Sequence, residues 1–160
     1  MPTKQGDVDL LHDPVAQQLL QVRGPAHLAY NWHDGTPRVV PIGFHWNGEE
    51  LVMATATDAP KTKVLTTGSK VAVSIDRDFS ASKILLIRGT VRADTVEGIA
   101  PEYTAMIHRT MSEEDAEALL KEAARLYPRM TRIFIHPDWV GIIDFETHLP
   151  SAVERAIERG

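Results

Sequence analysis

The spacing of apolar residues changes several times along the chain, and each change predicts a different element. Alternation with period two begins at Ala26, and an Asp-Gly pair at 34–35 predicts a tight turn into the next strand. Asn47-Gly48 is a second hairpin signal. The continuous apolar run "ILLI" is typical of a strand covered on both faces. The strands predicted in this way span 26–32, 38–46, 51–57, 71–76, 83–93, 132–136 and 140–145.

Helical spacing predicts helices near both ends and between the strands. Asp13-Pro14 has the form of an N-cap followed by proline at the first helical position, and Gly24-Pro25 ends that helix. Pro60 can open a helical turn that runs to Thr67. Two capping boxes are expected, at Ser112 with Asp115 and at Ser151 with Glu154. The stripe expected to pack beneath the first of these comprises Ala116, Leu119, Leu120, Ala123 and Leu126.

These elements predict one domain over residues 1–160, of the mainly β (α+β) class. Six or seven strands, mostly in hairpins, predict an antiparallel barrel with peripheral helices. A barrel is favoured over an open sheet because closure removes exposed strand edges.

Composition narrows the classes of function. The chain has no cysteine, which excludes disulfides, thiolate metal sites and cysteine nucleophiles, and is compatible with a reducing compartment. No run of 18 apolar residues occurs, and the N-terminus lacks the apolar core of a signal peptide, so a cytoplasmic protein without a membrane partner is expected. A net charge of −5 argues against a broad nucleic-acid surface.

The common catalytic motifs are absent from the sequence. The seven histidines show neither HExxH nor ligand spacing, so no metal site is predicted. There is no G-x-S-x-G elbow, G-x-G-x-x-G loop or P-loop. No catalytic residue can be named from these patterns.

Three cations remain as a possible phosphate site. Arg38 begins one predicted strand, and Lys61 and Lys63 follow the next. If these strands form a hairpin about Asn47-Gly48, Arg38 and Lys61 converge at one barrel rim, where they could bind an anion. The alternative is a solvated basic corner, and Lys63 fits it better because residues two apart on a helix point to different sides.

The ordered series from Arg38 to Arg92 resembles the pyridoxamine 5'-phosphate oxidase-like, or split β-barrel, family of flavin-binding proteins. The resemblance rests on Arg38-Val39-Val40, an apolar strand ending near Thr55, the "KTKVL" element at 61–65, and the strands at 71–75 and 84–92. A deazaflavin subgroup, which binds coenzyme F420, has a stretch similar to 61–65.

The resemblance implies a homodimer with FMN, or alternatively F420, at the subunit interface. Arg38 and Lys61 would bind the phosphate with support from Lys63, and Thr55 would bond near the phosphate or ribityl chain. The backbone of Val39, Val40, Pro41 and Ile42 would line the ring edge. The implied activity is hydride transfer to a small organic substrate.

The sequence also departs from the true oxidases of this family. Ala59-Pro60 stands where they carry Ser-Arg, a residue near Ile84 replaces a glutamine, and the C-terminal Arg-x-His pattern is absent. Vitamin B6 oxidation is therefore not expected, and a helical insert over 95–127 fits the broader reductase-like subgroup. Two further hypotheses remain open: a non-catalytic module that binds or senses a cofactor, and a dimeric barrel without cofactor.

Overall fold

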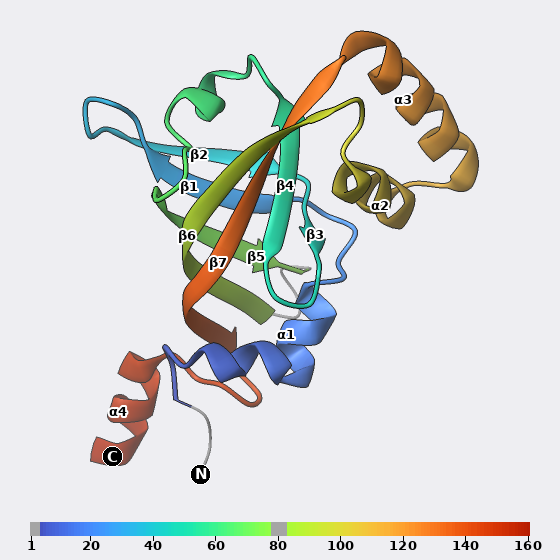
Figure 1. Ribbon diagram of the computed structural model, residues 1–160. Coiled ribbons are helices and arrows are strands. Elements are labelled where there is room, and N and C mark those ends of the chain that lie inside the picture. The colour runs from blue at the N-terminus through green and yellow to red at the C-terminus, as the bar shows by residue number, and fades with distance from the viewer. Residues whose placement is uncertain (1–3, 78–82) are drawn as a thin grey trace.

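In the computed structural model, residues 4–77 and 83–160 are described, and their strands form one antiparallel sheet (Figure 1). The strand order across the sheet is β2-β1-β5-β6-β7-β4-β3. The strands are β1 (Ala26–Asn31), β2 (Pro37–Ile42), β3 (His45–Trp46), β4 (Leu51–Ala56), β5 (Lys70–Asp76), β6 (Lys83–Glu97) and β7 (Arg129–Asp144). The helices are η1 (Val8–His12), α1 (Pro14–Leu19), η2 (Pro60–Lys63), α2 (Pro101–Thr110), α3 (Glu113–Leu126) and α4 (Ser151–Arg159).

The two longest strands, β6 and β7, join two half-sheets. They pair along their whole length, from Lys83 opposite Asp144 to Glu97 opposite Arg129. β5 pairs with the first half of β6, whereas β4 pairs with the first half of β7. The sheet wraps around the core but stays open, with β2 and β3 at its edges (Figure 1). The predicted split β-barrel is therefore confirmed.

The interior face of the sheet is apolar on every long strand. Leu28, Met53, Ile87 and Ile133 are completely or almost completely buried there. α1 covers this core with Leu19 and Leu20. Its start follows the sequence signal, since the Asp13 carboxylate accepts a hydrogen bond from the Val15 N–H at 2.9 Å.

The strand predicted over 38–46 is wrong in one respect, because it is broken between β2 and β3. β2 pairs with β1, and β3 pairs with β4 through the hairpin at Asn47-Gly48. At the break, Gly43 lies so close to α2 that an added Cβ would be 2.7 Å from the Met106 sulfur. The chain changes direction where the neighbouring Phe44 enters the core.

The two strands predicted at the C-terminal end are one strand, β7, which passes through Pro137. The register shifts between Arg88 and Gly89, opposite Pro137, and a Cβ on Gly89 would lie 2.5 Å from the His136 carbonyl oxygen. A bulge of this kind accommodates proline within a ladder. β6 also continues to Glu97, so the expected helical insert begins later, at Pro101.

Three details of the helices differ from expectation. The element at 60–67 is only the single 3₁₀ turn η2. α4 forms, but its N-cap is Pro150 and no side chain caps it, so the second capping box is wrong. The cap of α3 at Ser112 is confirmed. In its predicted stripe, Leu119 and Leu126 remain 36% and 52% exposed, and α3 packs mainly against α2. No helix of the described chain is long and apolar enough to cross a bilayer.

Candidate functional site

Alternation along β2 divides the predicted cofactor residues between two faces of the sheet. Arg38, Val40 and Ile42 lie opposite Tyr30, Leu28 and Ala26 of β1, respectively. Because Leu28 and Ala26 are buried in the core, this set faces the barrel interior. Val39 and Pro41 face outward and are exposed.

Arg38 lies at the end of this interior row, where the core gives way to solvent. Its guanidinium carbon is 5.4 Å from the centroid of the Trp32 ring, a cation–π arrangement. Within 4–77 and 83–160, no carboxylate forms a salt bridge with Arg38. Its charge is therefore available to an anion.

The two lysines of η2 differ in their surroundings. Lys61 is half-buried, and this burial lowers the pKa of its ammonium group, whereas Lys63 is exposed. No acidic side chain of the described residues lies within salt-bridge distance of Lys61. A partly desolvated cation without a partner is the arrangement expected at a binding site for an anion.

A row of threonines crosses the interior face near η2. Thr55 of β4 lies opposite Thr131 of β7, which in turn lies opposite Thr95 of β6. Thr131 is only 7% exposed. A hollow of about 380 Å³ opens beside this row, and its hydroxyl-bearing lining residues are Thr57, Thr62, Thr66, Thr67, Thr95 and Thr131.

Thr95 and Thr131 were not found by sequence reasoning. Their individual positions carry no motif, and only the register of three strands places them beside Thr55. Hydroxyl groups in such a row can donate to and accept from a polar chain such as a ribityl group.

The expected route by which Arg38 and Lys61 converge is wrong. β2 and β4 do not form a hairpin, since four strands separate them in the sheet. Both segments instead adjoin the start of β5. η2 leads into β5 through a loop in which Gly68 and Ser69 bond to Val91, and Pro37 of β2 lines a surface hollow together with Lys70.

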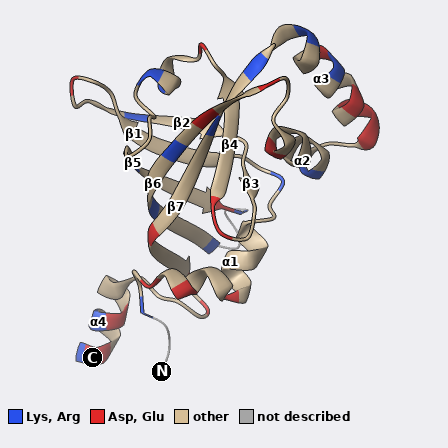
Figure 2. Cartoon of the chain, in the orientation of Figure 1, with Lys and Arg blue, Asp and Glu red and all other residues tan. Residues whose placement is uncertain are grey.

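One carboxylate, Asp94, lines the hollow beside the threonine row and is paired with Arg132. Arg132 donates to both oxygens of Asp94, at 2.8 and 2.7 Å, and to Glu102 at 3.0 Å. These hydrogen bonds lower the pKa of the Asp94 carboxyl below its ordinary value. Basic residues mark η2 in Figure 2, whereas acidic residues mark the β3–β4 turn. No group of three or more metal-binding side chains occurs in the ranges described.

Comparison with known proteins identifies similar solved structures. No protein-family model and no curated protein matches the chain. The chain is similar to an F420 reductase, with 26% identity and a TM-score of 0.59, covering 78% of this chain and 94% of that one.

Two further structures share the fold at lower identity. The FAD and heme binding protein from Mycobacterium smegmatis is 23% identical, with a TM-score of 0.54, covering 97% of this chain and 79% of its own. A Clostridium acetobutylicum protein related to general stress protein 26, of the pyridoxinephosphate oxidase family, is 13% identical, with a TM-score of 0.56 and coverages of 87% and 91%.

Proposed function

We propose that this chain, which has the pyridoxamine 5'-phosphate oxidase-like split-barrel fold, binds a flavin-type cofactor and reduces a small organic substrate. FMN is the cofactor expected first, and F420 is the alternative, supported by the similarity to an F420 reductase. The observation that carries the proposal is Lys61, a half-buried cation for which no partner carboxylate is found among the described residues. An anionic phosphate beside it would offset the cost of burying the charge.

The described residues fit the chemistry of such a cofactor. Arg38 and Lys61 supply positive charge for the phosphate, whereas the exposed Lys63 of the same turn would add only a weak, solvent-screened attraction. Thr55 and Thr131 supply hydroxyl groups for the polar chain. β2 is an edge strand, so the backbone groups of 39–42 that point away from β1 are free to bond the polar edge of the ring.

When bound, the reduced cofactor supplies a hydride, which the substrate takes up together with a proton. The protein's part is to hold the phosphate at Lys61 and Arg38, to align the ring along β2 and to limit access of water. No side chain is assigned to proton transfer, since hydride chemistry of this kind can draw the proton from solvent.

The outer face of the sheet supports a homodimer with the cofactor at the interface. Val39 is 66% exposed, and Pro41 beside it is also exposed. On β5 and β6, Ala72 is exposed and Leu86 is half-buried on the same outward face, which also carries the exposed His27 and Arg88. Apolar groups gathered on one sheet face are stabilised by burial against a second subunit. A cytoplasmic location remains a prediction from the sequence.

A non-catalytic module that stores or senses the cofactor would use the same residues. Measuring turnover distinguishes the oxidoreductase from the non-catalytic module, whereas measuring cofactor binding does not. With the bound cofactor reduced, we expect oxidation by at least one member of a panel of enones, quinones and nitro compounds. Binding without any turnover would favour the module, and no binding would favour the cofactor-free barrel.

Titration of purified protein with FMN and with F420 tests the proposal. Replacing Lys61 with Ala removes a charge-assisted contact worth about 1.5–3 kcal/mol, so affinity should fall about 10- to 100-fold. Lys63→Ala is the matched control and should change affinity only about threefold or less, because the Lys63 side chain is exposed. Equal losses in the two variants, or no loss at Lys61, would contradict the assignment.

A further inference from the structure

A second hollow, of about 560 Å³, lies at the opposite end of β4 from η2. Its walls come from η1, the β3–β4 turn and the bulge of β7, and it includes none of the cofactor residues proposed above. β4 runs from Leu51, next to this hollow, to Ala56, next to η2, which separates the two sites by about 17 Å along the strand.

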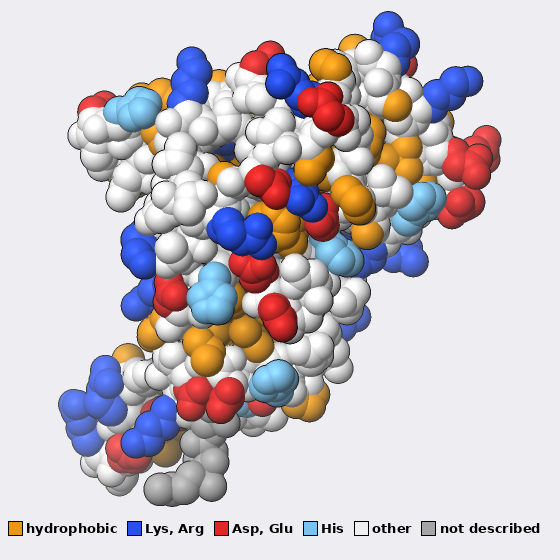
Figure 3. Space-filling view, in the orientation of Figure 1, with side chains coloured by type: hydrophobic (Ala, Val, Ile, Leu, Met, Phe, Trp, Pro, Cys, Tyr) orange, Lys and Arg blue, Asp and Glu red, His pale blue; other side chains and the backbone are white. Residues whose placement is uncertain are grey.

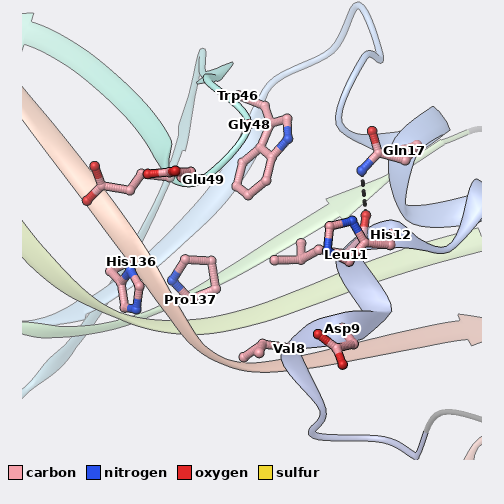
Figure 4. Close-up of a pocket in the computed structure, with 11 residues that line it drawn as sticks. Val8, Asp9, Leu11, His12, Gln17, Trp46, Gly48, Glu49, His136 and Pro137 are labelled. Atoms are coloured by element: carbon pink, nitrogen blue, oxygen red, sulfur yellow. Dashed lines mark hydrogen bonds between the residues drawn. The ribbon is translucent and has the colours of Figure 1, made fainter.

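The hollow has apolar and aromatic walls. Figure 4 shows Trp46 on one side, Leu11 and Val8 of η1 on another, and Pro137 of β7 between them. Trp46 is half-buried and Val8 is 41% exposed, so apolar surface faces the open volume. Its size is within the range of about 300–1,000 Å³ that is usual for small-molecule sites.

The turn that carries Trp46 is held in shape by its own sequence. The Asn47 side chain accepts hydrogen bonds from the N–H groups of Glu49 and Glu50, at 2.9 and 2.7 Å. Gly48 occupies the left-handed region at φ +99°, which favours glycine. The turn therefore holds the backbone that carries Trp46 and Glu49 in a defined conformation.

The lining of the hollow is rich in carboxylates. Its lining includes Asp9, Glu49 and Glu50, together with two imidazoles, and neither lysine nor arginine. Glu50 is paired with Arg92 at 2.9 Å, whereas Asp9 and Glu49 form no salt bridge with any residue the structure describes. In Figure 3, apolar side chains on this face are bordered by acidic and histidine side chains.

We infer that this hollow binds a small organic cation: an ammonium group, primary to quaternary, carried on an apolar body. The Trp46 ring can contact the ammonium group through its face, a cation–π interaction. Asp9 and Glu49 supply the complementary charge, and Pro137, Leu11 and Val8 contact the apolar body. A benzyl- or alkyl-ammonium compound meets all three requirements, whereas an anion or a neutral polar molecule does not.

Calorimetric titration with benzyltrimethylammonium tests this inference, with benzyl alcohol and benzoate as the neutral and anionic counterparts of the same ring. The protein is used without FMN or F420, so the result does not depend on the proposed cofactor function. We expect saturable 1:1 binding of the cation, at least about tenfold tighter than either counterpart. Absence of saturable binding, or equal affinity for benzoate, would overturn the inference.

Variants locate the site. Trp46→Ala should weaken binding of the cation about tenfold, and Trp46→Phe, which keeps an aromatic face, should retain most of it. Trp32→Ala is the matched control, because Trp32 is also half-buried but lies beside Arg38. Glu49→Gln should weaken binding about threefold, whereas Glu117→Gln, on exposed α3, should not change it. If Trp32→Ala weakened binding of benzyltrimethylammonium as much as Trp46→Ala, the assignment of the site would also be overturned.

Discussion

The two ends of β4 carry surfaces of opposite character. Beyond its last residue lies η2, with Lys61 half-buried near the row of threonines at Thr55 and Thr131. Before its first residue lies the turn that carries Trp46 and Glu49, in a hollow whose lining, among the described residues, holds neither lysine nor arginine. One short strand with a buried, apolar first half thus separates the proposed site for an anion from the proposed site for a cation. The difference shows that a net charge of −5 says little about local binding.

The largest expected effect comes from placing a charge on the outer face of the sheet at Val39. Val39→Asp places a carboxylate in the proposed apolar interface, so the dimer should dissociate and cofactor affinity should fall by about 100-fold or more. Analytical ultracentrifugation with cofactor titration measures both. Binding of benzyltrimethylammonium should be unchanged, because its site lies within one subunit. A variant that stays dimeric, or a wild-type monomer that binds cofactor, would contradict the interface.

Arg38→Ala should have the next largest effect. It removes one of the two cations proposed to hold the phosphate, and cofactor affinity should fall about tenfold, with no change at the acidic hollow. Arg38→Lys keeps the charge without the planar fork and should recover part of the loss. The cofactor titrations of wild type and Arg38→Ala should be repeated at high salt. There the difference in cofactor affinity between the two proteins should become smaller, because salt screens the charge of Arg38.

Asp94→Asn should lower the stability of the fold. Asp94 also lines the hollow beside the threonine row, so its effect is measured on unfolding and not on cofactor binding. The hydrogen bonds from Arg132 lower the pKa of the Asp94 carboxyl in the folded state. The ion pair therefore stabilises the fold above the unfolded pKa of the carboxyl, and this contribution is lost as the pH falls towards the folded value. Because Asp94 is more than a third exposed, we expect only about 1 kcal/mol at pH 7.

Urea unfolding of wild type and Asp94→Asn at pH 7 and at pH 3 measures this contribution. The free energy of unfolding should differ at pH 7, and the difference should shrink at pH 3. A difference that grows on acidification would show that the ionised Asp94 carboxylate does not stabilise the fold.

The smallest expected effect belongs to Thr131→Val. This nearly isosteric change removes a hydroxyl from the threonine row and should weaken cofactor binding about threefold. Thr110→Val, on α2 and away from the row, is the control. Equal affinities of Thr131→Val and wild type would remove the row from the cofactor site.

The parts of the fold that depend on local chemistry could be predicted from the sequence. The turns at Asp34-Gly35 and Asn47-Gly48 form because each Asn or Asp side chain bonds to the backbone two residues ahead. α1 begins at Asp13-Pro14 for a similar local reason.

The parts of the fold that depend on contacts between distant residues could not be predicted from the sequence. The break between β2 and β3 lies where Met106 of α2 approaches Gly43, more than 60 residues away in the chain. Thr131 lies beside Thr55 only through the register of β7. The acidic hollow combines three separate segments, so no short motif marks it. Arg38 and Lys61 were proposed from an expected hairpin and supported by the family resemblance, but that hairpin does not exist.

The central claim is that the cofactor phosphate lies at the η2 end of β4. A crystal structure of the protein with FMN or F420 tests it most directly. We predict a phosphate oxygen within hydrogen-bond distance of the Lys61 ammonium group, the ring along β2, and a second subunit closing the site. A cofactor whose phosphate lies away from Lys61, or a protein to which neither cofactor binds at millimolar concentration, would contradict the account.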